Sequence, residues 1–194
     1  LTHGTVATVS DPHEIANVAG TRGIEWFLAS AEKTKLDLRV MLSSCVPASH
    51  LETNGAGIIT GKDLAPFQNH AKVLGLAEMM NFPSVIHNDP EVLSKLEQFA
   101  HQRIDGHSPL LRGQALSTYL VGGASSCHEC VYLDEAAEKV SKGMSVWIRE
   151  GSVARDLENL IPLLKMETST SLGFCTDDRN PLDIREQGHI DYLI

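Results

Sequence analysis

The 194-residue sequence lacks any continuous apolar run of about 18 residues, the length that a helix needs to cross a membrane. It also lacks an initiator Met and a signal-peptide pattern, since it begins Leu1-Thr2-His3-Gly4. Its four cysteines are too few for a disulfide scaffold in a chain of this length. These absences argue against a membrane-spanning segment, and they favour a reducing cytoplasm.

Positive charge is scarce as well. The chain has 16 Lys and Arg residues against 25 Asp and Glu residues, which gives a net charge of −9. This balance argues against a surface for nucleic acid or anionic membranes. Hydrophobic residues make up 42% of the chain, and the 15 glycines bring the apolar set to the globular average. The composition therefore argues against disorder, collagen-like repeats and coiled coils.

Neither end of the sequence resembles the terminus of a complete domain. A strand is predicted at Thr5–Val9, almost at the start, and the stretch Ile190–Ile194 ends on apolar residues without a polar tail. Complete domains usually finish in exposed, polar termini. We therefore expect an internal piece of a larger protein, with a short chain that has a docked terminus as the alternative.

Between the ends, strand and helix patterns alternate. The apolar runs predict seven buried strands: Thr5–Val9, Leu36–Leu42, Val73–Ala77, Arg103–Gly106, Gly123–Ser126, Met144–Ile148 and Leu172–Cys175. Amphipathic stretches between them predict helices, for example at Glu14–Ala31, Pro90–Ala100, Leu111–Leu120, Leu133–Lys142 and Ala154–Leu164. This alternation predicts one domain over residues 1–194, with a parallel sheet covered by helices.

Two of these helices carry end signals. Pro90 begins a typical first turn, which Asn88 or Asp89 is placed to cap. In the stretch that starts at Leu133, acids such as Glu135 come early and Lys139 comes late. That order suits the helix dipole.

Polar residues follow almost every predicted strand. They are Ser10–His13, Ser43–Cys45, Glu78, His107, His128–Glu129, Arg149–Glu150 and Asp177–Asp178. An open doubly wound sheet places function only beside its switch point, whereas a (β/α)8 barrel gathers all strand ends at one mouth. No G-x-G-x-x-G or phosphate loop is present. The pattern favours an incomplete (β/α)8 TIM-type barrel of about seven βα units.

Four residues at these strand ends are candidate metal ligands: Glu78, His107, His128 and Asp177. Their separations of 29, 21 and 49 residues match one, one and two βα units. The four would then lie on the fourth, fifth, sixth and eighth strands of a barrel whose first strand is missing. Imidazoles and carboxylates that converge in one pocket suit Zn²⁺, Mn²⁺ or Fe²⁺.

Other residues suggest alternative sites. Cys127 and Cys130 form a C-x-x-C pair, which is typical of a structural zinc knuckle or a redox pair. No second C-x-x-C follows, and Cys45 and Cys175 stand alone, so a four-cysteine zinc site is not expected. His13 also lies at a strand end, where it is placed to face the mouth.

Longer strings of the sequence extend these motifs over the whole chain. They are Val9–Val18, Ser44–Ala48, Leu74–Pro83, Asp105–Pro109, His128–Cys130, Ile148–Ser152, Phe174–Arg179 and Gly188–Leu193. In order and in register, they resemble the bacterial adenine deaminases of the amidohydrolase superfamily. The resemblance implies a metal-dependent (β/α)8 barrel that hydrolyses adenine to hypoxanthine and ammonia, with two divalent metals, typically Mn²⁺ or Fe²⁺.

The resemblance also implies roles for individual residues. Glu78 would bridge the two metals, and His107 and His128 would bind one of them. Asp177 would bind the other metal and take the proton from the attacking water. Asp178 is the alternative for that role, and Glu129 is a candidate for later proton delivery to the ring.

The chain departs from the family pattern in three places. The His-x-His pair of the first strand and the β-sandwich built from both termini are missing, and Cys127 stands where the family usually has Asp. The missing pair keeps a second hypothesis open, an inactive fragment that binds one metal or a purine. The third hypothesis is a related amidohydrolase that acts on another cyclic amidine or amide. The expected ligand is a small purine, and no interaction with nucleic acid or with a membrane is expected. Whether the protein forms a homo-oligomer stays open.

Overall fold

Seven parallel strands form two sheets in the computed structural model, which describes residues 1–194. The sheet order is β1-β2-β3-β4 and β5-β6-β7, so every strand pairs with its neighbour in the sequence. The strands are β1 (Ala7–Ser10), β2 (Asp37–Leu42), β3 (Val73–Met79), β4 (Arg103–Gly106), β5 (Ser126–Cys127), β6 (Ser145–Arg149) and β7 (Leu172–Cys175). Sequential parallel pairing is what repeated strand–helix units produce.

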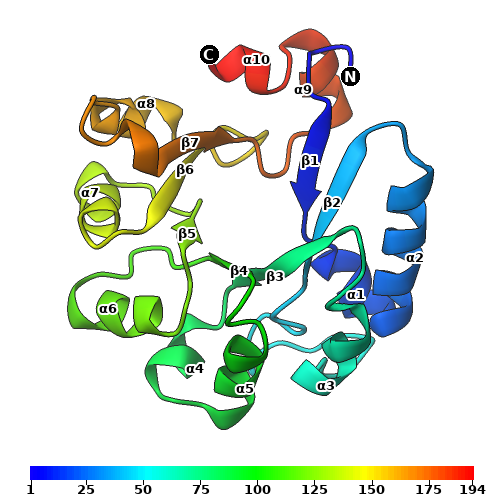
Figure 1. Cartoon of the computed structure of the whole chain (residues 1–194). Helices are drawn as coiled ribbons and strands as arrows, with labels where there is room; N and C mark the ends of the chain where they lie inside the picture. The colour runs from blue at the N-terminus through cyan, green and yellow to red at the C-terminus, as the bar shows by residue number, and fades with distance from the viewer.

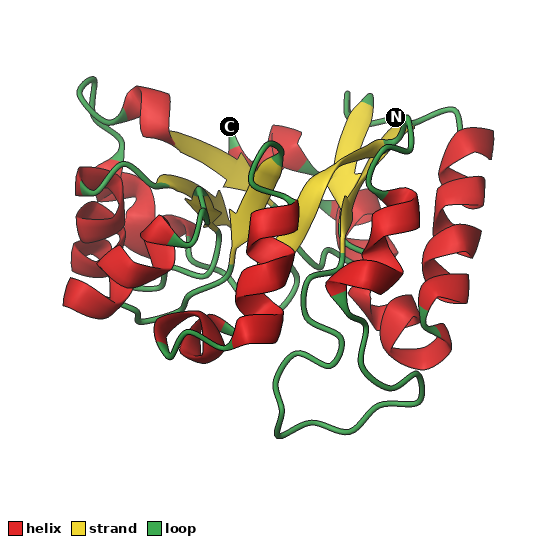
Figure 2. Cartoon of the chain, turned by 60° about the horizontal axis from the view of Figure 1, so that its bottom comes forward, coloured by secondary structure: helices red, strands yellow, loops and turns green.

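The two sheets follow one another along a curved wall. The backbone N–H of Ser125, just before β5, donates to the carbonyl of Ile104 in β4 at 3.0 Å. In Figure 1 the strands lie along the inside of an arc with helices around the outside, and Figure 2 shows the same arrangement from another side. The parallel strands are therefore curled into a half-barrel.

The connections between strands are mostly helical. The α-helices are α1 (His13–Ala19), α2 (Thr21–Lys33), α3 (Gly61–Leu64), α4 (Phe82–Ile86), α5 (Pro90–Gln98), α6 (Gly113–Val121), α7 (Leu133–Ser141), α8 (Leu157–Leu160), α9 (Pro181–Glu186) and α10 (Ile190–Leu193). Short 3₁₀ turns lie at Ala65–Phe67, Ile161–Leu163 and Ser169–Ser171. None of the helices combines the length and the apolar character that a bilayer crossing requires.

The bounds of the predicted strands agree with the structure to within a few residues, except in one case, but the expected burial is wrong for β1 and β7, which contain no buried residue. β4 and β7 have the predicted bounds, whereas β3 continues to Met79, so that Glu78 lies inside the strand. The predicted strand Gly123–Ser126 is wrong in position, because only Ser126 and Cys127 pair with β6. Gly123 has φ +102°, a conformation that interrupts extended backbone.

Two helix predictions are wrong in their extent. The single helix expected at Glu14–Ala31 is divided into α1 and α2 at Gly20, which has φ +63°. The helix expected at Ala154–Leu164 is reduced to α8 and a 3₁₀ turn that contains Pro162, a residue without a backbone donor.

The core lies between the strands and their helices, and one of its residues bears directly on the site. Tyr119 of α6 is fully buried. Its hydroxyl donates to the carbonyl of Met79 at 2.8 Å and accepts from the backbone N–H of His107 at 2.9 Å. This bridge fixes the end of β3 against the loop that follows β4. It therefore links Glu78, next to Met79, with His107.

The first and last segments of the chain lie side by side. Thr5 Oγ1 is 2.8 Å from His189 Nδ1, and His3 Nδ1 is 3.2 Å from Asp191 Oδ2. Figure 1 accordingly shows the N-terminus beside α9 and α10. The C-terminal helices thus pack near the entry to β1.

Candidate metal centre

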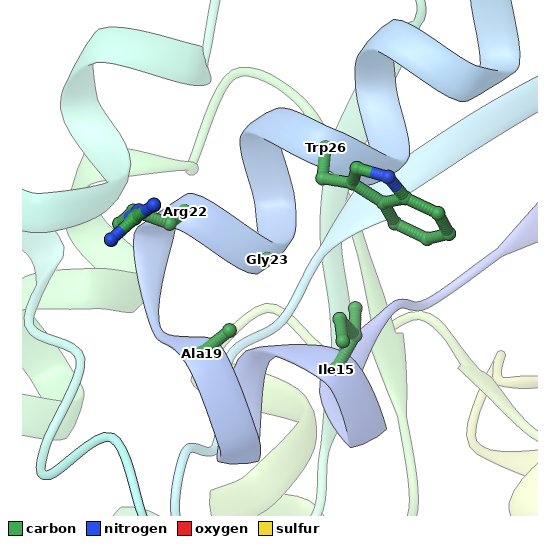
Figure 3. Close-up of a pocket in the computed structure, with 5 residues that line it drawn as sticks. All are labelled: Ile15, Ala19, Arg22, Gly23 and Trp26. Atoms are coloured by element: carbon green, nitrogen blue, oxygen red, sulfur yellow. The ribbon is translucent and has the colours of Figure 1, made fainter.

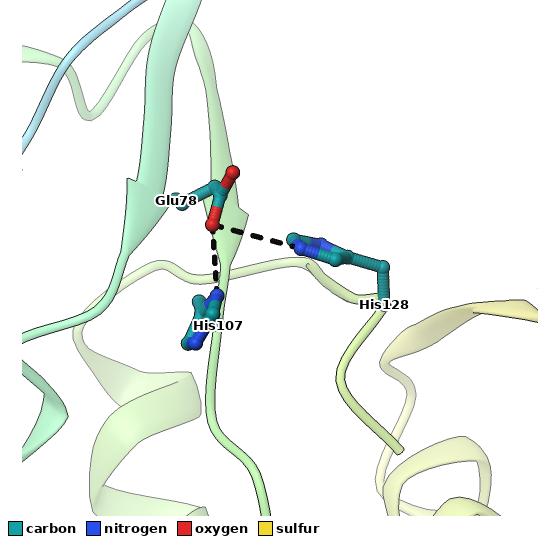
Figure 4. A group of neighbouring side chains, drawn as sticks. All are labelled: Glu78, His107 and His128. Atoms are coloured by element: carbon teal, nitrogen blue, oxygen red, sulfur yellow. Dashed lines mark hydrogen bonds and ion pairs between the residues drawn. The ribbon is translucent and has the colours of Figure 1, made fainter. Parts of the chain in front are cut away.

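Three side chains converge at the carboxyl ends of β3, β4 and β5. Glu78 is the penultimate residue of β3, while His107 and His128 directly follow β4 and β5. The carboxyl ends of neighbouring parallel strands lie along the same edge, so residues far apart in the sequence meet there. In Figure 4 both imidazoles point toward the Glu78 carboxylate.

The geometry of this group suits a metal ion. His107 Nδ1 donates to Glu78 Oε2 at 2.8 Å, and His128 Nε2 lies 3.6 Å from the same oxygen. The two imidazole rings are 5.4 Å apart between centroids, at an angle of 77°. The three ligand atoms all lie within 4.8 Å of one another, and the residues are partly buried. Two imidazoles and a carboxylate at this spacing are donors that Mn²⁺, Fe²⁺ and Zn²⁺ accept.

Burial and the neighbouring charges shift the pKa values of Glu78 and His107. Burial raises the pKa of the Glu78 carboxyl, but the hydrogen bond from His107 and the charges of His128 and His107 hold it below its usual range. Burial lowers the pKa of His107, and the hydrogen bond to Glu78 and the carboxylate charge outweigh this and raise it. A metal ligand must be deprotonated, so the raised pKa of His107 makes metal binding here more dependent on pH.

A second group shares Glu78. Asp11 and His13, which lie directly after β1, have ligand atoms within 4.8 Å of each other and of Glu78. His13 Nδ1 donates to Asp11 Oδ2 at 3.0 Å, and Ser43 Oγ donates to Asp11 Oδ1 at 2.5 Å. The hydrogen bond to Asp11 raises the pKa of His13 to about 9. His13 therefore carries a positive charge at neutral pH and opposes a second cation.

A third group consists of His128, Glu129 and Asp177. The guanidinium of Arg149, at the end of β6, donates to Asp177 Oδ2 at 3.0 Å and to Glu129 Oε1. Burial lowers the pKa of Arg149, but the charges of Glu129 and Asp177 and their hydrogen bonds raise it above its usual range. A permanent cation thus lies against both carboxylates of this group.

The structure separates the two adjacent aspartates. Asp177 has φ +51°, and its carboxylate lies against Arg149. Asp178 is exposed and forms no ion pair, while its carbonyl accepts from the backbone N–H of Ser152 at 2.9 Å. The four ligands expected from the sequence therefore divide: Asp177 joins His128 but not Glu78 and His107.

The C-x-x-C pair holds a different cation. All four cysteines are free, and Lys139 Nζ lies 3.4 Å from the sulfur of Cys127 and 3.5 Å from that of Cys130. The ammonium contacts both sulfurs, so a zinc ion bound there would have to compete with it.

Sequence reasoning missed the parts played by Asp11, Arg149 and Lys139. Asp11 and Arg149 stand at strand ends, and that position was their only signal. Lys139 gave none, because a lysine near the end of an amphipathic helix is usually solvated.

The surface also carries a hollow of about 420 Å³ between α1 and α2 (Figure 3). It is lined by Ile15, Ala19, Arg22, Gly23 and Trp26. None of these residues belongs to the three groups of candidate ligands. The hollow therefore contributes nothing to the candidate centre.

Comparisons with known proteins agree with this architecture. The matching family model is described as "Amidohydrolase family" and covers residues 1–182. A protein named adenine deaminase 1 from Agrobacterium fabrum is 57% identical over 194 residues, which are 100% of this chain and 34% of that protein. Adenine deaminases from Gluconobacter oxydans and Brucella abortus are 55% and 54% identical over the whole chain, which covers 34% and 33% of their lengths. The chain thus spans about a third of the curated relatives that it matches. Since the family model takes in most of its residues, the chain belongs to the amidohydrolase family.

Proposed function

We propose that this chain is part of an enzyme that hydrolyses adenine to hypoxanthine and ammonia. The observation that carries the proposal is the convergence of Glu78, His107 and His128 within 4.8 Å at the strand ends. Relatives named adenine deaminase, 54–57% identical over the whole chain, support the choice of substrate. Because the chain covers about a third of their length, the activity is proposed for the longer protein.

We also propose that the half-barrel is part of a (β/α)8 barrel. In this arrangement β1 to β7 are its second to eighth strands, and residues 1–194 form a single partial domain. The unbroken sequential pairing within each sheet supports this assignment. The position of Glu78, His107 and Asp177 at carboxyl strand ends is typical of barrel enzymes.

A divalent metal fits the donor set of the first group. Glu78, His107 and His128 would hold it, and Mn²⁺ or Fe²⁺ is proposed on the resemblance, with Zn²⁺ as an alternative that the same donors accept. When bound, the metal would activate water as a nucleophile near neutral pH. The hydrogen bond between His107 and Glu78 keeps both side chains oriented toward the metal position.

The chain's own carboxylates are proposed to move the protons. Asp177 takes a proton from the attacking water, and Glu129 delivers one to the purine ring. Arg149 contacts Asp177 through Oδ2 and Glu129 through Oε1, so the second oxygen of each carboxylate is free to accept a proton. General acid–base catalysis requires such a group at hydrogen-bond distance from the reacting atoms.

The proposed surroundings follow from composition and cysteine chemistry. A small purine is the proposed ligand, and neither nucleic acid nor membrane is expected as a partner of a chain with net charge −9. The four free cysteines support a reducing, cytoplasmic compartment.

A chimera tests the proposal. The chain replaces the matching segment of the Agrobacterium fabrum relative, and adenine-dependent ammonia release is measured together with metal content. We expect deamination. Glu78→Gln should remove most activity and lower the metal content, because Gln keeps the shape but loses the negative charge.

The matched control is Glu97→Gln, an exposed glutamate of α5, which should leave both quantities unchanged. Near-normal turnover of the Glu78 variant with full metal loading would exclude its role. Hydrolysis of another cyclic amidine with none of adenine would favour the related-amidohydrolase alternative.

A further inference from the structure

Helix α7 contains a fully buried ion pair directly behind the candidate metal centre. Lys139 Nζ lies 2.7 Å from Glu135 Oε1, and the two side chains are 0% and 1% exposed. Lysine and glutamate are rarely buried to this degree without a structural reason, because both ions lose their hydration. The remaining contacts of the pair indicate what the reason is.

Lys139 contacts the backbone and side chains on both histidine-bearing loops. Its Nζ donates to the carbonyl of Ser108 at 2.6 Å and lies 3.4 Å from the sulfur of Cys127. Ser108 directly follows His107, and Cys127 directly precedes His128. One ammonium thus connects the immediate neighbours of both imidazoles.

Glu135 extends the same connection. Its Oε1 accepts from the backbone N–H of Leu110 at 2.8 Å, and its Oε2 accepts from that of Val131 at 3.5 Å. Leu110 belongs to the loop after β4, and Val131 to the loop after β5. Since Lys139 Nζ also lies 3.5 Å from the sulfur of Cys130, the pair joins the segment after β4 to β5 and its following loop through five contacts.

The separation of the two imidazoles depends on these loops, because β4 and β5 share few ladder hydrogen bonds. β5 has only two residues, and β4 and β5 belong to different sheets. With so little ladder, the position of His128 relative to His107 depends on side-chain contacts, which include Ser126 Oγ with Asp105 Oδ1 at 3.0 Å and those of Lys139 behind the site. A metal site needs its ligands held within fractions of an ångström.

We propose that Lys139 is a positioning residue that, with Glu135, sets the separation of His107 and His128 for a divalent metal. The inference rests on the proposed metal site at Glu78, His107 and His128. Residues that hold metal ligands from behind typically change metal affinity by roughly 10- to 100-fold when they are lost. If the ion pair were purely structural, its loss would instead lower the stability of the metal-free and metal-bound chains equally.

The test uses the whole 194-residue chain and Co²⁺ as the probe. Co²⁺ affinity and its visible absorption, which reports coordination geometry, are measured by titration. The urea midpoint is determined with and without Co²⁺, since binding to the folded state alone raises it. The variants are Lys139→Met and the charge-free double variant Glu135→Gln/Lys139→Met, which leaves no unpaired buried ion.

The control is Lys142, the residue directly after the last residue of the same helix. Lys142 pairs with Glu138 at 3.0 Å with the same four-residue spacing, but both side chains are partly exposed. Lys142→Met should leave Co²⁺ affinity and absorption unchanged. Either Lys139 variant should weaken Co²⁺ binding about 10- to 100-fold, alter the absorption bands and shrink the metal-induced shift of the urea midpoint.

The failures of the two proposals are distinguishable. A folded Lys139 variant with wild-type Co²⁺ affinity, or one with a lower urea midpoint but an undiminished metal-induced shift, would overturn the positioning role. His107→Ala reports on the site itself and should abolish tight binding. Undiminished binding by the His107 variant would overturn the metal site, and the inference with it.

Discussion

At the residue scale, His13 has the largest shift toward the charged form among the histidines of the site. Its hydrogen bond to Asp11 raises its pKa from 6.5 to about 9. A raised folded-state pKa contributes stability that is fully present below pH 6.5 and is lost as the pH rises through about 9. We therefore expect the metal-free chain to lose part of its free energy of unfolding between these two pH values.

Urea unfolding of wild type and His13→Asn in the presence of a chelator measures this contribution. The difference between the two proteins should be greatest below pH 6.5 and should shrink as the pH passes about 9. His50→Asn, in an exposed turn, serves as the control and should follow wild type throughout. Parallel pH profiles for wild type and the His13 variant would contradict the prediction.

The two adjacent aspartates make a second prediction at this scale. Both aspartates are exposed, but Asp177 forms an ion pair with Arg149 and Asp178 forms none. In the chimera, Asp177→Asn should therefore lower turnover of adenine by about 10²-fold or more, the scale of lost general-base catalysis. Asp178→Asn should lower the turnover of adenine distinctly less. Steady-state rates with metal content measured alongside decide between them, and a reversed order would assign the base to Asp178.

Some residues of the site were predictable and others were not. Glu78, His107 and His128 could be identified because strand-end position and ligand chemistry are both visible in a sequence. Lys139 could not, since its place near the end of α7 is equally typical of a solvated lysine that complements the helix dipole. Its burial depends on the loops after β4 and β5, which no local pattern describes.

At the element scale, helix α5 has the clearest start. Asp89 accepts hydrogen bonds from the backbone N–H groups of Glu91 and Val92 at 3.0 and 3.2 Å. Of the two residues expected to cap this helix, Asp89 does so, and Asn88 has φ +57°. Asp89→Ala should lower the free energy of unfolding by about 1 kcal/mol, measured in urea.

The control for this prediction is Ser94→Ala, an exposed substitution in the middle of the same helix. It removes a hydroxyl without removing a cap, and alanine favours the helix interior. It should therefore leave stability unchanged or slightly raised. An equal loss in both variants would mean that the cap is not the cause.

The elements themselves were predictable where their pattern was long. Strands such as β2, which is buried over its last three residues, and the partly buried β7 produce apolar runs that helix periodicity does not imitate. The division of α1 from α2 was not predictable, because Gly20 interrupts a pattern whose apolar spacing continues on both sides. β5 was misplaced for a similar reason, since Gly123 and its neighbours are apolar without being extended.

At the scale of the whole molecule, the three groups of candidate ligands overlap. Glu78 belongs to two of them, and His128 to two. The sequence predicted that strand ends converge, since this follows from the order of strands and helices. It did not predict how the side chains divide among groups, because that depends on the reach of each side chain and on Arg149, which forms ion pairs with Asp177 and Glu129.

This overlap limits how many metal ions the isolated chain binds. A cation at Glu78, His107 and His128 uses one ligand of each of the other two groups, and of these two ligands only the Glu78 carboxylate can bridge to a second cation. The second group would still have to displace the proton of His13, whose pKa is raised to about 9. The third would have to compete with Arg149, which is always charged and lies 3.0 Å from Asp177.

We therefore expect the 194-residue chain to retain one equivalent of Mn²⁺ through dialysis, measured by elemental analysis. His107→Ala should reduce this to a small fraction, because it removes a ligand of the first group alone. Arg149→Met should permit weak additional binding, since it frees two carboxylates beside His128. Two equivalents retained by the unmodified chain would show that neither the charge of His13 nor that of Arg149 excludes a second cation.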